Sequence, residues 1–166
     1  MADDRRVYIF GGCGDSGRFN DLWAYDPVDG KWMEYPTGGG GLKGRGGQGL
    51  AVAQDKIWVV YGFTGMEMDD VHYFHLAQNK WSQVETSGEK PTAKGVFFMC
   101  AIGKYVYIYG GEVDPSDLGH LGPGSSRERF TRWTRRRWSG GWAGLRESSW
   151  AEGLFLRTFY AISLIK

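Results

Sequence analysis

The chain has 166 residues, of which 27 are glycine and 16% are aromatic. Its net charge of +1 and its two cysteines predict neither a strongly charged partner nor a disulfide framework. The first residues lack the apolar core of a signal peptide, and no apolar run reaches the length of about 20 residues that a membrane helix needs. We therefore expect a cytoplasmic protein built from many short strands and tight turns.

A short motif that ends in glycine occurs three times, at steps of 50 and 49 residues, as Tyr8–Gly12, Trp58–Gly62 and Tyr107–Gly111. Between these motifs further positions match at a step of 49, namely Asp21 with Asp70, Leu22 with Val71, Tyr25 with Phe74 and Trp32 with Trp81. A constant step of this length indicates one supersecondary unit that repeats along the chain.

The best-preserved period predicts four strands, at about 48–53, 56–62, 70–76 and 81–85. Asp55-Lys56 is the predicted hairpin turn between the first two strands, and residues 77–80 turn the chain between the last two. The apolar runs are nearly continuous, which favours sheets that are buried on both faces.

A glycine pair followed by a spaced aromatic residue and then a tryptophan resembles the kelch repeat. The resemblance implies an all-β fold, a partial kelch β-propeller of about two and a half four-stranded blades with an irregular C-terminal tail. The predicted domain is residues 7–124, with a partial first blade at 7–36, a second blade at about 45–88 and a partial third blade at 94–124.

Four segments resemble the plant kelch proteins of the nitrile-specifier and epithiospecifier family: Arg45–Gly49, Lys56–Phe63, Gly103–Ile108 and Gly111–His120. Members of that family are single propellers of about six or seven blades that direct the breakdown of glucosinolate aglucones toward nitriles and depend on ferrous iron. The resemblance implies the same activity for an intact relative, and we expect this chain to be an inactive fragment, because so few blades cannot close a ring.

Composition changes near residue 125, after which the chain is strongly basic and contains no aspartate. A change of reading frame near Glu128 explains this, because residues 129–139 back-translate in another frame to a kelch-like strand, turn and tryptophan. The alternative is a genuine tail in which arginine and tryptophan bind RNA or single-stranded DNA. We favour the change of frame for residues 125–166 and expect no nucleic-acid partner.

The loop after the third motif carries Glu112, Asp114, Asp117 and His120 within nine residues. Carboxylates and imidazole suit Fe(II), Mn(II) or Zn(II), whereas Asp-Pro-Ser-Asp is also ordinary turn chemistry. In the resembling family this loop holds the proposed iron ligands, as glutamate, aspartate and histidine with three residues between neighbours. Glu112 and His120 match the outer positions, while Ser116 stands at the middle one, where Asp117 or Asp114 could substitute only with a different loop backbone. The predicted ligands of Fe(II) are therefore Glu112 and His120 together with Asp117, or with Asp114 in its place.

Two basic residues, Arg45 and Lys94, stand at matching places before the first strand of their periods. Either side chain can point into the propeller mouth and hold a sulfate or carboxylate group, or it can be a solvated loop cation. His72 and His75 fall on opposite faces of one strand, which argues against a shared metal. The run Gly38–Gly41 lacks the context of a phosphate-binding loop and is predicted to be a linker.

Two functions follow. An intact specifier-like relative binds a small-molecule aglucone with Fe(II), whereas a non-catalytic kelch module binds a protein partner. Neither involves a membrane, and the sequence predicts no catalytic side chain apart from the metal ligands.

Overall fold

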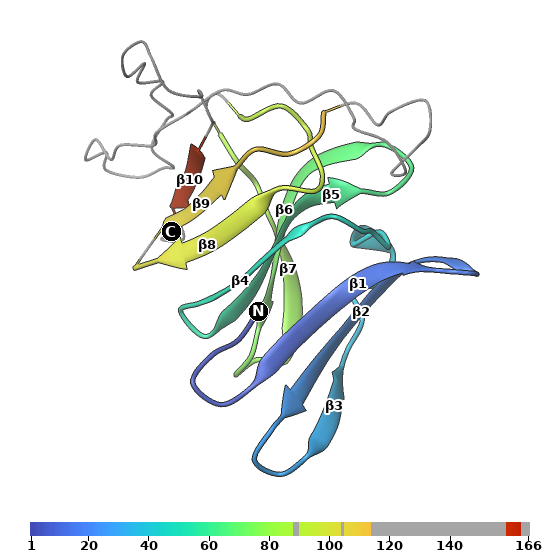
Figure 1. The fold of residues 1–166 in the computed structure, drawn as a ribbon, viewed down its shortest axis with the longest axis vertical. Helices are drawn as coiled ribbons and strands as arrows, with labels where there is room; N and C mark the ends of the chain where they lie inside the picture. Colours follow the sequence, from blue (N-terminus) through green and yellow to red (C-terminus); the bar gives the residue numbers. More distant parts are fainter. Residues whose placement is uncertain (88–89, 104, 114–158, 164–166) are drawn as a thin grey trace.

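Three antiparallel sheets stand side by side in the computed structural model (Figure 1), which describes residues 1–87, 90–103, 105–113 and 159–163. The first contains β1 (Val7–Gly14), β2 (Gly17–Asp26) and β3 (Lys31–Tyr35). The second contains β4 (Gly49–Ala53), β5 (Lys56–Phe63), β6 (Glu67–His75) and β7 (Lys80–Val84). The third contains β8 (Phe98–Ile102), β9 (Tyr105–Tyr109) and β10 (Phe159–Ser163). We call these sheets blades 1, 2 and 3, and they confirm the prediction of an all-β, partial propeller.

Within each blade every strand pairs with its neighbour in the chain, as in a meander. The predicted strands of blade 2 match the observed ones closely. The predicted turn at Asp55-Lys56 is wrong by one residue, because Lys56 already pairs with Ala53. The loop is Gln54-Asp55, whose φ angles of 55° and 56° fit a two-residue turn with positive φ at both positions.

Apolar side chains fill the space between neighbouring blades. The core between blades 1 and 2 contains Tyr8, Phe10, Leu22, Ala24, Leu42, Ile57, Val59 and Phe74. The core between blades 2 and 3 contains Ala51, Trp58, Val60, Tyr61, Val71, Val84, Met99, Val106 and Ile108. Because strand residues alternate in direction, blade 2 contributes to both cores and is covered on both faces.

Glycines of the repeated motif let the next blade approach closely. A Cβ on Gly11 would lie 2.7 Å from the carbonyl oxygen of Arg45 and 2.8 Å from that of Phe19. A Cβ on Gly62 would lie 3.0 Å from the Cα of Gln48. Glycine is required here by contact with the backbone of the crossing segment, and the φ of +59° at Gly11 adds a second reason.

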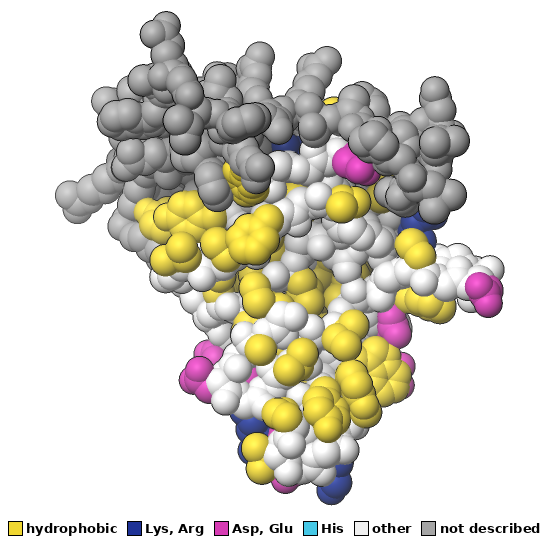
Figure 2. Space-filling model, in the orientation of Figure 1, with side chains coloured by type: hydrophobic (Ala, Val, Ile, Leu, Met, Phe, Trp, Pro, Cys, Tyr) yellow, Lys and Arg dark blue, Asp and Glu magenta, His cyan; other side chains and the backbone are white. Residues whose placement is uncertain are grey.

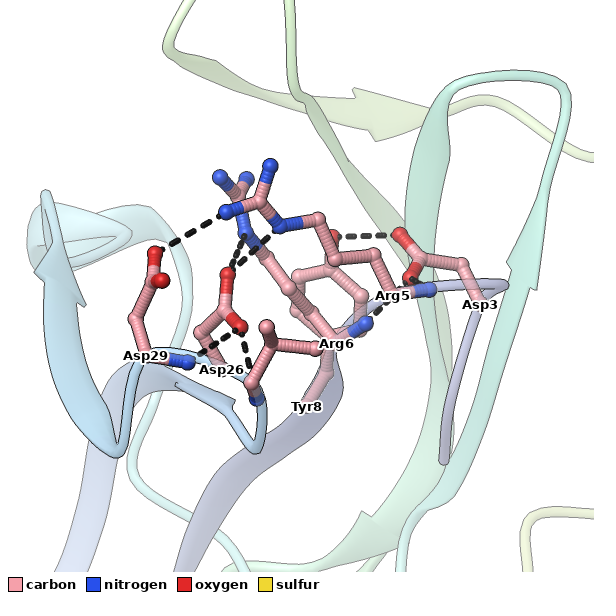
Figure 3. A network of polar contacts seen from close by, with 7 residues as sticks. Asp3, Arg5, Arg6, Tyr8, Asp26 and Asp29 are labelled. Atoms are coloured by element: carbon pink, nitrogen blue, oxygen red, sulfur yellow. Dashed lines mark hydrogen bonds and ion pairs between the residues drawn. The ribbon is translucent and has the colours of Figure 1, made fainter.

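A short polar network holds the residues before β1 against the turn between β2 and β3 (Figure 3). Arg5 Nε donates to the Asp26 carboxylate at 2.6 Å, and its Nη2 donates to Asp29 at 3.0 Å. The Tyr8 hydroxyl donates to Asp3 at 2.7 Å. Ala2 also forms an antiparallel bridge with β1, so blade 1 has a short pairing on the edge where the sequence predicted no strand.

The sequence predicts an irregular C-terminal tail, and β10 departs from that prediction. This strand pairs with β9 from Tyr105 to Tyr109, in the place that β6 occupies beside β5 in blade 2. The open edge of β9 presents backbone N–H and C=O groups that an added strand satisfies. Trp133 and Trp138 lie outside the described residues, and the change of reading frame stays a prediction.

We predict that Gly11→Ala destabilises the chain more than Gly30→Ala. Both glycines have a left-handed φ, at +59° and +65°, but a Cβ on Gly30 meets nothing within 4 Å. Gly30→Ala should therefore cost about 1 kcal/mol from conformation alone. Gly11→Ala adds a clash with backbone oxygens, which raises the cost by roughly a further 1–3 kcal/mol. Urea unfolding followed by tryptophan fluorescence measures both, and equal costs would contradict the close approach.

Candidate functional site

The chain crosses from one blade to the next at the end of the molecule where the glycine pairs lie. In the first crossing, the carbonyl oxygen of Arg45 accepts a hydrogen bond from the N–H of Gly12 at 2.9 Å. In the second, the carbonyl oxygen of Lys94 accepts from the N–H of Gly62 at 3.0 Å. The two basic residues that the sequence singles out therefore occupy equivalent places on consecutive blades.

The Arg45 side chain is fully buried, with 0% of its surface exposed. Its Nη1 and Nη2 bond the two carboxylate oxygens of Asp70 at 2.5 and 2.8 Å, which is a bidentate ion pair. Nη1 also donates to the carbonyl oxygen of Tyr61 at 3.0 Å, and Nε donates to that of Lys43 at 3.1 Å. Most of the guanidinium donors are thus used inside the protein, and the ligand role predicted for Arg45 stays a prediction.

Asp70 also contacts His72, whose Nε2 lies 2.9 Å from a carboxylate oxygen. Burial by itself raises the pKa of the Asp70 carboxyl. Hydrogen bonds from Arg45 and His72, together with their charge, outweigh that effect and hold the pKa well below its usual range. The ionised carboxylate is therefore the form that the folded chain stabilises.

Blade 1 contains a partial copy of this arrangement. Trp23 Nε1 donates to the Asp21 carboxylate at 2.8 Å, as His72 does to Asp70 one blade later. The sequence aligned these positions at a step of 49 but missed the bond between Arg45 and Asp70. The recurrence of Asp21 as Asp70 could have predicted the partner of Arg45, because a buried arginine needs an acidic partner.

Lys94 is also buried, with 1% of its surface exposed. Its Nζ donates to the carbonyl oxygen of Gly110 at 3.4 Å, a long hydrogen bond. Burial lowers the pKa of the Lys94 ammonium to about 8. The equivalent place in blade 3 thus holds a cation that titrates near physiological pH.

Glu112 follows the glycine pair of β9, and its backbone forms a bridge with Gly95, the residue after Lys94. The other predicted metal ligands, Asp117 and His120, lie outside the described residues, as do Asp114 and Ser116. Within the described residues no group of three or more His, Cys, Asp and Glu side chains comes together to hold a metal.

The two histidines of β6 and the glycine run Gly38–Gly41 have structural roles. His72 belongs to the buried Asp70 contact, and its spacing from His75 matches the two faces of β6. The run Gly38–Gly41 links blades 1 and 2, and Gly39–Gly41 forms one turn of 3₁₀ helix. In the described part of the chain no helix is long and apolar enough to cross a membrane.

We predict that Asp70→Asn lowers the free energy of unfolding by roughly 3–5 kcal/mol at pH 7, because it leaves the buried Arg45 charge without a counterion. The Asp70 pKa is depressed by folding, so its contribution is complete above the unfolded-state pKa of about 4 and is lost as pH falls below it. The gap between wild type and Asp70→Asn should therefore shrink from pH 5 to pH 3.

The matched control is Asp69→Asn, which removes the neighbouring carboxylate at an exposed ion pair with Lys90. It should change stability by less than about 1 kcal/mol at every pH. Urea unfolding at a series of pH values measures all three proteins. A gap that stays constant with pH, or an equal loss in the control, would contradict the role given to Asp70.

The model of the KLHDC2/KLHL20/DRC7 Kelch-repeats domain matches residues 1–111. The N-(sulfonatooxy)prop-2-enimidothioate sulfolyase of Thlaspi arvense is 38% identical over 151 residues, which cover 78% of this chain and 43% of that protein. Kelch domain-containing protein 10 of Xenopus tropicalis is 25% identical over 128 residues, covering 67% of this chain and 31% of that protein. Leucine-zipper-like transcriptional regulator 1 of Homo sapiens is 27% identical over 97 residues, covering 56% of this chain and 12% of that protein. The chain spans less than half the length of each of these three relatives.

Proposed function

Because the chain belongs to the kelch-repeat family, we propose that it supplies part of a propeller that binds a sulfated thiohydroximate-type aglucone and directs its breakdown to a nitrile. The expected resemblance to plant specifier proteins is confirmed by the similarity to the Thlaspi arvense sulfolyase. The name of that relative states a substrate with a sulfonatooxy group and a thioate sulfur. A substrate of this class needs a cation for its sulfate and a soft or borderline metal for its sulfur.

One observation supports the proposal: two buried cations, Arg45 and Lys94, occupy equivalent crossings beside Gly12 and Gly62 of consecutive blades. Arg45 is neutralised by its bidentate bond to Asp70, so its charge is largely compensated within the blade. Lys94 stands one blade further along, next to the segment that leads to Glu112. Lys94 is a buried ammonium with a pKa of about 8, and it is the cation that the proposal assigns to the sulfate group.

Glu112 is the described residue that fits a ferrous ion, since its carboxylate is an oxygen donor placed directly after the glycine pair. Asp117 and His120 would complete the ligand set that the specifier resemblance implies. A bound Fe(II) would act as a Lewis acid toward the substrate's sulfur and oxygen atoms. The chain's own contribution is the backbone bridge between Gly95 and Glu112, which joins the segments that carry Lys94 and Glu112.

The second candidate is a kelch module that binds a protein, favoured by the similarity to kelch proteins such as Kelch domain-containing protein 10. The two candidates differ in what they require at the glycine-pair end. Only the first requires a bound anion and metal there, so metal and anion binding by the chain separates them.

We predict that Fe(II), titrated into the 166-residue chain under argon, binds at a site that Glu112→Gln and His120→Ala each weaken at least about tenfold. Glu34→Gln, at an exposed position on β3, is the matched control and should bind like wild type. The same proteins are then assayed for nitrile formation from an aglucone. Equal affinity in all four proteins would exclude this loop as the metal site, and iron binding without nitrile formation would match the inactive fragment that the sequence predicts and leave nitrile formation to an intact propeller.

We also predict that the affinity for inorganic sulfate falls as pH rises through about 8, where Lys94 loses its proton. The fall should be roughly tenfold, because losing a nearby unit charge at an effective dielectric near 20 weakens the attraction by about 1–2 kcal/mol. Lys94→Met should bind weakly at every pH and show no such step. Lys80→Met, which removes an exposed lysine, is the control. An unchanged pH step in Lys94→Met would remove Lys94 from the proposal.

A further inference from the structure

The outer faces of blades 1 and 3 carry apolar side chains at the places that are buried between blades elsewhere in the chain. Ile9 is 46% exposed, whereas Val59, at the matching place on blade 2, is 0% exposed under blade 1. Val7 and Ile57 differ in the same way. The uncovered face of blade 1 is therefore equivalent to a face that another blade covers within the same chain.

The aromatic pairs make the equivalence specific. Tyr25 and Trp32 pack with ring centroids 5.0 Å apart on blade 1, as Phe74 and Trp81 do at 5.2 Å on blade 2. In blade 2 the edge of Phe10 from blade 1 meets Trp81 at 5.5 Å. Trp32 occupies on blade 1 the position that Trp81 occupies on blade 2, and it is more than half exposed. By analogy with Trp81, a blade face that carries side chains like Tyr8 and Phe10 fits against Trp32.

The outer face of blade 3 offers the complementary surface. Phe98 and Ile102 are exposed on β8, and Tyr107 of β9 lies on the same face, because Cys100 and Tyr107 are partners in the pairing of the two strands. These positions correspond to the face that blade 2 presents to blade 3. Figure 2 shows hydrophobic side chains at the surface over both end sheets, the β1–β3 sheet and the β8–β9 sheet.

We propose that two copies of this chain assemble head to tail, with blade 3 of each covering blade 1 of the other. The three blades that the structure describes in each copy make a ring of six, which lies within the range of four to eight blades found in closed propellers. Two copies related by a two-fold axis close the ring, so no apolar blade face remains exposed. This inference does not depend on the proposed sulfate and iron chemistry.

The occupant is a second copy because the two open faces belong to the same chain and match its own internal interfaces. Direct contact between two blade 1 faces would set Trp32 against Trp32, an arrangement that neither internal interface uses. The interface between blades 1 and 2 sets Tyr8 and Phe10 of one blade against the aromatic pair of the next. Each contact therefore joins two unlike faces, blade 3 of one copy and blade 1 of the other, and the two-fold axis makes the two contacts identical.

Sedimentation velocity on the 166-residue chain tests the proposal. Wild type should sediment as a dimer, and Ile9→Lys and Phe98→Lys should each raise the dissociation constant at least about 100-fold. Each substitution places an unpaired ammonium in both interfaces of the ring. Both side chains are exposed within one chain, so the folded monomer should be retained, which circular dichroism verifies. Val28→Lys, at an exposed position in the β2–β3 turn, is the control and should remain dimeric.

Mixing the two interface variants gives the decisive result. A mixed pair has one intact interface, between blade 3 of Ile9→Lys and blade 1 of Phe98→Lys, so the mixture should associate although neither variant associates alone. A dimer that Phe98→Lys leaves unchanged would indicate contact between blade 1 faces and overturn the ring. A monomeric wild type would overturn the ring and assign the open faces to blades of another chain. Large open assemblies would show that the contacts between copies do not close into a ring.

Discussion

The backbone of each crossing segment lies against the last glycine of the repeated motif in the preceding blade, Gly12 in blade 1 and Gly62 in blade 2, and the spacing of the blades depends on this contact. The carbonyl oxygens of Arg45 and Lys94 accept the N–H groups of these two glycines. A side chain on Gly11 would meet backbone oxygens at less than 3 Å, and backbone oxygens cannot move aside without breaking their own hydrogen bonds. Once the crossing is fixed, the apolar faces of consecutive sheets come together and form the two cores.

The same crossing segment explains why a cation is buried at this end. A residue just inside the crossing has its side chain between two sheets, where an isolated charge is costly. In blade 2, Asp70 offsets this cost because its planar carboxylate pairs with the planar guanidinium of Arg45. The same carboxylate accepts a second hydrogen bond from His72. Such a pair adds little net stability over an apolar pair, but it fixes the position of the crossing relative to β6.

The repeat predicted the strands well because glycine, aromatic and tryptophan positions recur at one step and report directly on backbone geometry. The Asp55-Lys56 turn was misplaced by one residue because Gln54 takes a positive φ, which its residue type does not predict. The partner of Arg45 was missed because ion pairs join residues distant in sequence, although Asp21 and Asp70 already marked the place. The pairing of β10 with β9 could not be predicted, since an open strand edge accepts any compatible segment.

Blades 2 and 3 differ at the crossing by the exchange of arginine for lysine, and this difference has a chemical consequence. A guanidinium stays charged at any pH that a folded protein tolerates, and its fork matches one carboxylate in two places. An ammonium is a point charge that loses its proton when burial makes the charge costly, and the lowered pKa of Lys94 reflects this. Arg45 is therefore suited to holding the crossing segment against β6, because its charge is permanent and already paired with Asp70. The charge of Lys94 depends on its surroundings, and an anion bound nearby would raise the Lys94 pKa. Lys94 would then keep its proton, and the positive charge would strengthen the binding of the anion.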